Sequence, residues 1–290
     1  MPVQWTLLLF GLFAGIGLAC LGIAALSEFL DKNSKVRRPL VVCSLVLMVV
    51  GGLCSFFHLN SPEHLFYVLG NLRSGITIEL VLTGLSFAAA VLYLLTMNKN
   101  QTALRRGIAG LCLALAIVFP FSTGTAYSVM TARPAWASIF LPLMYLVSAW
   151  AGGLLVSAVL SALKEPAEKM ASHALLAIGG LGAFAASIAL WIVSIGTAPY
   201  QDYSRSVNIV MAGDYSVLFW GGVIALGVIA PIILMMSLRI RAKRSSCTSG
   251  SGACVAKAAA ALLSFVAGSA VLRVIVYLLG TSIHSYIYVM

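Results

Sequence analysis

The sequence has very little charge, since only 9% of its 290 residues are Asp, Glu, Lys or Arg and 61% are hydrophobic. Soluble domains hold about 25% charged and about 45–50% apolar residues. Acidic residues are especially scarce, with 8 against 18 basic ones, and there are only 4 histidines. The shortage of charge excludes a water-soluble protein, and the shortage of acids and histidines leaves few groups that could carry chemistry.

Long apolar runs are abundant instead, and each is about as long as the roughly 20 residues that cross a bilayer as a helix. They lie near residues 5–30, 39–58, 76–96, 107–127, 137–163, 172–197, 215–238 and 257–280. Barrel strands would alternate apolar and polar residues, whereas the stretch from Leu40 to Phe57 is apolar on every side. We therefore expect an all-α integral membrane protein, with eight transmembrane helices in one domain over residues 1–290.

The ends of these runs carry further information. The first run has no positive leader and no small-residue cleavage site after it, so we expect a retained helix rather than a signal peptide. The loops are short, and no soluble domain is expected between the helices. Small residues concentrate in the first and fifth helices, where they predict close helix contacts: Gly11, Ala14, Gly15 and Gly17, and Ala149, Ala151, Gly152 and Gly153.

The formal charge of +10 is unevenly distributed along the sequence. Fourteen of the eighteen basic residues lie in or beside odd-numbered loops, whereas the second, fourth and sixth loops carry one each, Arg73, Arg133 and Arg205. The positive-inside rule places the odd loops in the cytoplasm and both termini on the outer face. The excess of basic residues therefore indicates the orientation of the protein in the membrane rather than nucleic-acid binding.

Metal and haem sites are not expected. Haem needs histidines that face one another inside helices, but His58, His64, His173 and His284 all lie at helix ends or in loops. Cys247 and Cys254 flank a Ser/Gly-rich stretch, and their six intervening residues fit no metal knuckle. We expect these two to be reduced thiols in a flexible cytoplasmic loop.

Three ionisable residues in or beside the apolar runs are candidate functional groups, because such side chains are costly in a bilayer. Glu79 lies about one turn into the third helix, where a partly desolvated carboxylate can exchange protons, or can pair with Arg73 and favour the helix dipole. His58 ends the second helix at the same outer face and could hydrogen-bond a ligand or only solvent. Arg273, in the middle of the last helix, needs either a ligand or an acid such as Glu79 or Asp214.

Several short motifs resemble the family of membrane-anchor subunits of dimethyl sulfoxide reductase. They are His58-Leu-Asn-Ser-Pro62, then Leu69-Gly-Asn71-Leu-Arg73-Ser74, then Glu79-Leu. The similarity continues through Tyr127 with Pro134-Ala-Trp136, Asp214-Tyr215, and Arg273 with Tyr277. Asn60 departs from the glycine that is usual in the family, and Gly75 from a common tryptophan.

The resemblance implies a haem-free anchor in the bacterial cytoplasmic membrane that binds menaquinol during anaerobic respiration. The electrons of menaquinol would pass to a four-cluster ferredoxin-like iron–sulfur subunit and then to a molybdopterin catalytic subunit. Glu79 would accept a proton from the quinol and His58 would hydrogen-bond it. The quinol-binding residues would be Ser61, Pro62, Asn71, Arg73, Tyr127, Trp136 and Arg273.

Two other interpretations stay open. The protein could be a purely structural anchor, in which the unusual charges only pair with one another. It could also be a small-solute transporter, although no inverted repeat and no matched pair of broken helices supports one. An anchor sequence does not encode the terminal substrate of its complex.

Overall fold

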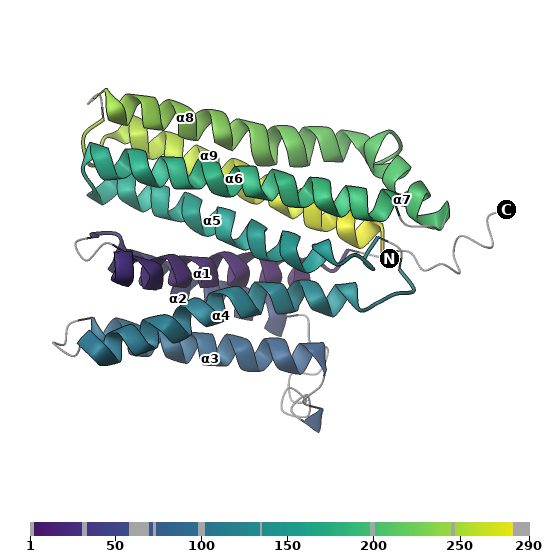
Figure 1. Cartoon of the computed structure of the whole chain (residues 1–290), viewed down its shortest axis with the longest axis horizontal. Coiled ribbons are helices and arrows are strands. Elements are labelled where there is room, and N and C mark those ends of the chain that lie inside the picture. The colour runs from purple at the N-terminus through teal and green to yellow at the C-terminus, as the bar shows by residue number, and fades with distance from the viewer. Residues whose placement is uncertain are drawn as a thin grey trace.

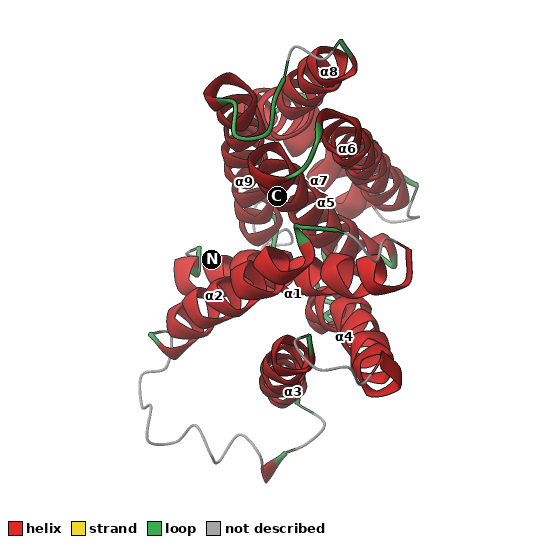
Figure 2. Cartoon of the chain, turned by 90° about the vertical axis from the view of Figure 1, so that its left-hand side faces the viewer, coloured by secondary structure: helices red, strands yellow, loops and turns green. Residues whose placement is uncertain are grey.

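The computed structural model describes residues 3–30, 34–57, 70–71, 74–97, 102–133, 135–197, 201–244 and 247–280. Within these ranges the regular structure is entirely helical (Figure 2). Eight helical segments of this part of the protein are long and apolar enough to cross a membrane. The expectation of an all-α protein with eight candidate spans is confirmed, whereas the side of the membrane on which the termini lie stays a prediction.

The helices run back and forth along one direction, so that the first helix begins and the last helix ends at the same end of the bundle (Figure 1). In order along the sequence they are α1 (Trp5–Leu30), α2 (Arg37–Phe56), α3 (Gly75–Thr96), α4 (Thr102–Ser128), α5 (Phe140–Lys164), α6 (Ala167–Gly196), α7 (Gln201–Met211), η2 (Leu218–Ile229), α8 (Ala230–Lys243) and α9 (Gly252–Leu278). The π-helical η2 continues directly into α8, and the two form the seventh span. The short α7 lies within the segment expected to be the sixth loop.

Helix α1 is the centre of the bundle, because 83% of its most apolar window is buried inside the protein. Its small residues explain how its neighbours come close. A Cβ atom on Gly15 would lie 3.3 Å from Cβ of Ala149 on α5, and one on Gly17 would lie 3.1 Å from the Ser44 carbonyl oxygen on α2. The small residues of α1 thus lie at helix contacts, as predicted.

Helix α3 is peripheral, with 22% of its span window buried, and it packs mainly against α4 and less against α2 (Figure 2). Its far end is attached to the bundle by a buried carboxylate, Glu28 at the end of α1. Glu28 is 2% exposed, and it pairs with Arg37 at 2.7 Å and Arg105 at 2.8 Å. The Tyr93 hydroxyl of α3 lies 3.4 Å from the same carboxylate. Glu28, Arg37, Tyr93 and Arg105 form what we call the Glu28 cluster. It joins the end of α1, the start of α2, the end of α3 and the start of α4.

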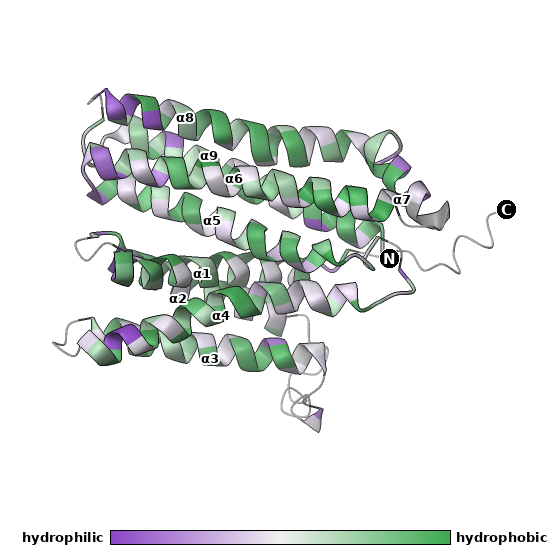
Figure 3. Ribbon diagram, in the orientation of Figure 1, coloured by the Kyte–Doolittle hydropathy of each residue, from purple (hydrophilic) through white to green (hydrophobic). Residues whose placement is uncertain are grey.

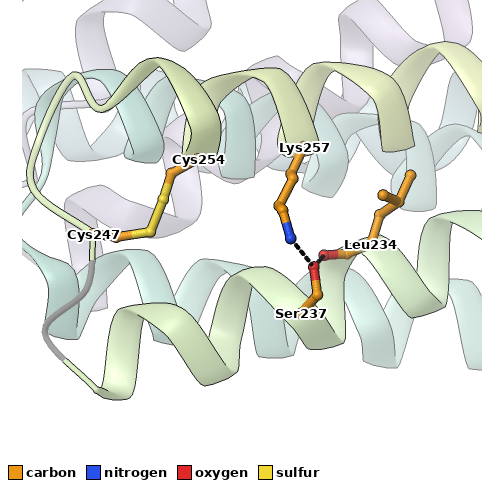
Figure 4. The surroundings of a disulfide bond; sticks show 5 residues. All are labelled: Leu234, Ser237, Cys247, Cys254 and Lys257. Atoms are coloured by element: carbon orange, nitrogen blue, oxygen red, sulfur yellow. Dashed lines mark hydrogen bonds between the residues drawn. A yellow bond between two sulfur atoms is a disulfide. The ribbon is translucent and has the colours of Figure 1, made fainter.

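A disulfide joins Cys247, in the loop between α8 and α9, to Cys254 in the first turn of α9, and their Cα atoms are 6.4 Å apart (Figure 4). The prediction of two separate reduced thiols was wrong. The loop folds back onto the end of α5: the Gly250 amide donates to the Ala162 carbonyl at 3.0 Å, and the Ser249 hydroxyl donates to the Leu163 carbonyl at 3.0 Å. Gly250 adopts φ 77°, a left-handed conformation that glycine permits. The resulting turn brings both sulfur atoms together.

Candidate functional site

Glu79 is held close to the start of α3 and is partly buried. Thr123 on α4 and Arg273 on α9 lie near its carboxyl group, and the positive charge of Arg273 attracts it. The hydroxyl group of Thr123 donates to the Phe119 carbonyl at 3.2 Å. Of the two acids considered as partners for Arg273, Glu79 is the one that interacts with it, and Asp214 lies exposed in the turn after α7.

Arg273 is a buried cation, 5% exposed, whose guanidinium carbon lies 4.3 Å from the ring centroid of Tyr145 on α5. Gly11 of α1 leaves the space for it, because a Cβ there would lie 3.1 Å from Nη1 of Arg273. Within the described residues, Nε of Arg273 is buried and has no hydrogen-bond partner. A buried donor without a partner is costly, and such atoms in native proteins often meet a ligand or water.

Tyrosine and tryptophan side chains form the wall beside this pair. The hydroxyl groups of Tyr127 on α4 and Tyr277 on α9 are 2.6 Å apart. The ring of Trp136, between α4 and α5, packs edge-on against Tyr127 with centroids 5.1 Å apart, and its Nε1 donates to the Val276 carbonyl at 2.6 Å. These contacts fix the orientation of the aromatic rings. They leave the two tyrosine hydroxyl groups near Glu79 and Arg273.

An apolar groove of about 450 Å³ lies between α3 and α4 on the same part of the molecule. Gly75 and Ile78 line it from α3, while Val118 and Phe121 are among the α4 residues that do so. Ile78 is 40% exposed and directly precedes Glu79 in the sequence. The groove thus reaches the sequence neighbour of Glu79, although Glu79 itself does not line it.

The structure brings together four of the predicted site residues, Glu79, Tyr127, Trp136 and Arg273, at one end of the bundle. Asn71 is exposed in the turn before α3, where its carbonyl accepts from the Ser74 amide at 3.1 Å. The other predicted residues lie outside the described part of the protein and stay untested: His58, Ser61, Pro62 and Arg73.

Sequence reasoning missed three members of the cluster, Gly11, Thr123 and Tyr145. Thr123 precedes Tyr127 by four residues, so helical periodicity could have placed both on one face. Gly11 was predicted only as a packing residue. No pattern in the sequence pointed to Tyr145, because its place under Arg273 depends on how α5 and α9 are rotated against each other.

Within the described ranges, no group of three or more His, Cys, Asp or Glu side chains lies close enough together to hold a metal ion. The groups that are present suit a small organic ligand with exchangeable protons: a carboxylate, a guanidinium with a free donor, tyrosine hydroxyls and aromatic rings.

Eight helices that are long and apolar enough to cross a membrane define a multi-pass membrane protein. The chain belongs to the NrfD family, described as polysulphide reductase, whose model matches residues 1–272. It is also 28% identical over 170 residues to a subunit of the anaerobic dimethyl sulfoxide reductase of Escherichia coli (strain K12). That match covers 55% of this chain and 58% of the relative, so the chain spans little more than half of the relative's length. The family resemblance inferred from the motifs is confirmed.

Proposed function

We propose that this protein is the membrane anchor and menaquinol-oxidising subunit of an anaerobic respiratory molybdopterin reductase in the bacterial cytoplasmic membrane. The observation that carries this proposal is the buried Arg273, whose Nε has no hydrogen-bond partner among the described residues and whose charge acts on the partly buried Glu79 carboxyl group. Membership of the NrfD family and similarity to a subunit of dimethyl sulfoxide reductase support the type of complex.

The chemistry follows from the residue types. Oxidation of a quinol releases two electrons and two protons, so it needs a proton acceptor and a polar clamp beside an apolar slot. Glu79 accepts a proton from a quinol hydroxyl, while Arg273 donates a hydrogen bond through Nε to a ring oxygen. The Tyr127 and Tyr277 pair encloses the ring, and the groove between α3 and α4 takes the isoprenoid tail.

The remaining assignments rest on the motifs. By these motifs, His58 hydrogen-bonds the quinol, and Ser61, Pro62, Asn71 and Arg73 are further quinol-binding residues. The electrons pass to an iron–sulfur subunit of the four-cluster ferredoxin type seated on this end of the bundle, and from it to the molybdopterin subunit. The proposed site needs no haem.

Gly11 gives a test that separates a quinol site from a purely structural anchor. Gly11→Val would push against Nη1 of Arg273, and we expect it to lower quinol oxidation by the purified complex about ten-fold or more, since small displacements of positioning groups are costly. The partner subunits should stay bound. Gly52→Val on α2 is the matched control, because a Cβ there meets nothing within 4 Å.

The result is measured as menaquinol-analogue oxidation and, in the same preparation, as the ratio of subunits that co-purify. If Gly11→Val kept full oxidation with its subunits assembled, the role of Arg273 would have to be abandoned. If only assembly failed, the structural anchor would be the better interpretation.

The orientation is a separate expectation: the basic loops face the cytoplasm and both termini face outward. Single cysteines at Asn208 on α7 and Arg106 on α4 report it, because both residues are exposed and lie at opposite ends of the bundle. A membrane-impermeant maleimide added to intact cells should label Asn208→Cys and spare Arg106→Cys. Labelling of Arg106→Cys alone would show that the protein has the opposite orientation in the membrane.

A further inference from the structure

We propose that a pocket between α6 and α8, at the end of the bundle opposite Glu79, binds the anionic headgroup of a membrane phospholipid. The pocket has a volume of about 360 Å³. Its lining includes Glu168, Ser172 and Leu175 from α6, and Arg239, Ala242 and Lys243 from α8. None of these residues belongs to the quinol site, so the two proposals stand independently.

The charge of the pocket suits a phosphate group. Arg239 and Lys243 are four residues apart and therefore lie on the same face of α8. Among the described residues, the salt bridges involve neither of them. One carboxylate, Glu168, lies in the same lining, so the pocket carries a net positive charge with both cations present. The start of α6 at Ala167 adds the positive end of a helix dipole.

The position of the pocket points to a lipid rather than a soluble anion. It lies at the ends of two membrane-spanning segments, where hydrophilic residues gather in Figure 3. Towards the middle of the membrane the same two helices expose apolar side chains that acyl chains can contact, with Leu176 56% and Met236 51% exposed. Basic pockets between transmembrane helices on the cytoplasmic side bind anionic headgroups, and this is the leaflet in which such lipids are enriched.

The test uses the purified, delipidated complex and two probes, phosphatidylglycerol and phosphatidylcholine, with bound lipid counted by native mass spectrometry. We expect phosphatidylglycerol to bind in preference to phosphatidylcholine. The double variant R239Q/K243Q should weaken phosphatidylglycerol binding about thirty-fold, from the loss of about 1 kcal/mol for each cation. R106Q, which removes an exposed cation at the same end of the bundle, is the matched control and should bind as the wild type does.

Two further arms separate a lipid site from damage to the fold or from a general anion site. E168Q removes the carboxylate of the pocket and should tighten phosphatidylglycerol binding about five-fold, a gain that misfolding cannot produce. Inorganic phosphate at the same concentration should not displace the lipid. Equal binding of both lipids, unchanged binding in R239Q/K243Q, weaker binding in E168Q, or displacement by free phosphate would each overturn the proposal.

Discussion

Replacing Glu79 with glutamine should lower the turnover of menaquinol oxidation by at least about 100-fold, the usual contribution of a positioned proton acceptor. The amide has nearly the same shape, so it can occupy the same place near Thr123 and Arg273. What it cannot do is take the proton that leaves the quinol hydroxyl. The measurement is the initial rate with a reduced menaquinol analogue, using complex purified in detergent.

Two comparisons make this result specific. Glu79→Asp keeps a carboxylate and should recover part of the rate. Glu168→Gln removes an exposed carboxylate at the opposite end of the bundle and should leave the rate unchanged. Full turnover in Glu79→Gln, with all subunits present, would show that the carboxylate is structural and that the proton has another acceptor.

The second large effect concerns stability rather than turnover. Glu28→Gln removes the shared partner of Arg37 and Arg105 in the Glu28 cluster, and leaves two like charges close together. Breaking a buried ion pair costs about 3–5 kcal/mol. We expect the free energy of unfolding to fall by about 3 kcal/mol, the low end of this range. The side chains of the two arginines are 14% and 19% exposed, so they can turn towards water when the carboxylate is lost.

The loss is measured by denaturant titration of the purified protein in detergent micelles. Glu168→Gln is again the matched control, since that carboxylate is exposed and takes part in neither of the two salt bridges of the described residues. Unchanged stability in Glu28→Gln would mean that lipid headgroups or water replace the carboxylate without cost. Peripheral α3 would then depend on its packing against α4 instead.

Much of the candidate site was predictable because consecutive spans reverse direction. The start of the third span and the end of the fourth must lie on the same side of the membrane, and this places Glu79 and Tyr127 at one end. Arg273 was expected in the middle of the last helix, whereas the structure places it near the end of α9 and close to Glu79. Runs of apolar residues predicted the number of spans for an equally simple reason, since a bilayer of fixed thickness needs helices of a minimum length.

Helix ends and loop structure were less predictable. Helices α4, α6 and α9 each begin five residues before the apolar run that predicted them. The extra residues lie towards the basic loops, because polar residues can stay helical after the polypeptide leaves the hydrocarbon layer. The disulfide between Cys247 and Cys254 depends on a loop that hydrogen-bonds to α5, a contact between segments far apart in the sequence.

The sequence by itself determined that this protein crosses the membrane as apolar helices, and which of its few charged residues share an end of the bundle. Hydropathy and the alternating direction of the spans are properties of local sequence, so they need no knowledge of neighbours. Only the tertiary structure decided that Arg273 lies on Tyr145 over the gap at Gly11, and that Glu28 binds two arginines. These pairings depend on the rotation and separation of helices, which side-chain packing sets across the whole bundle.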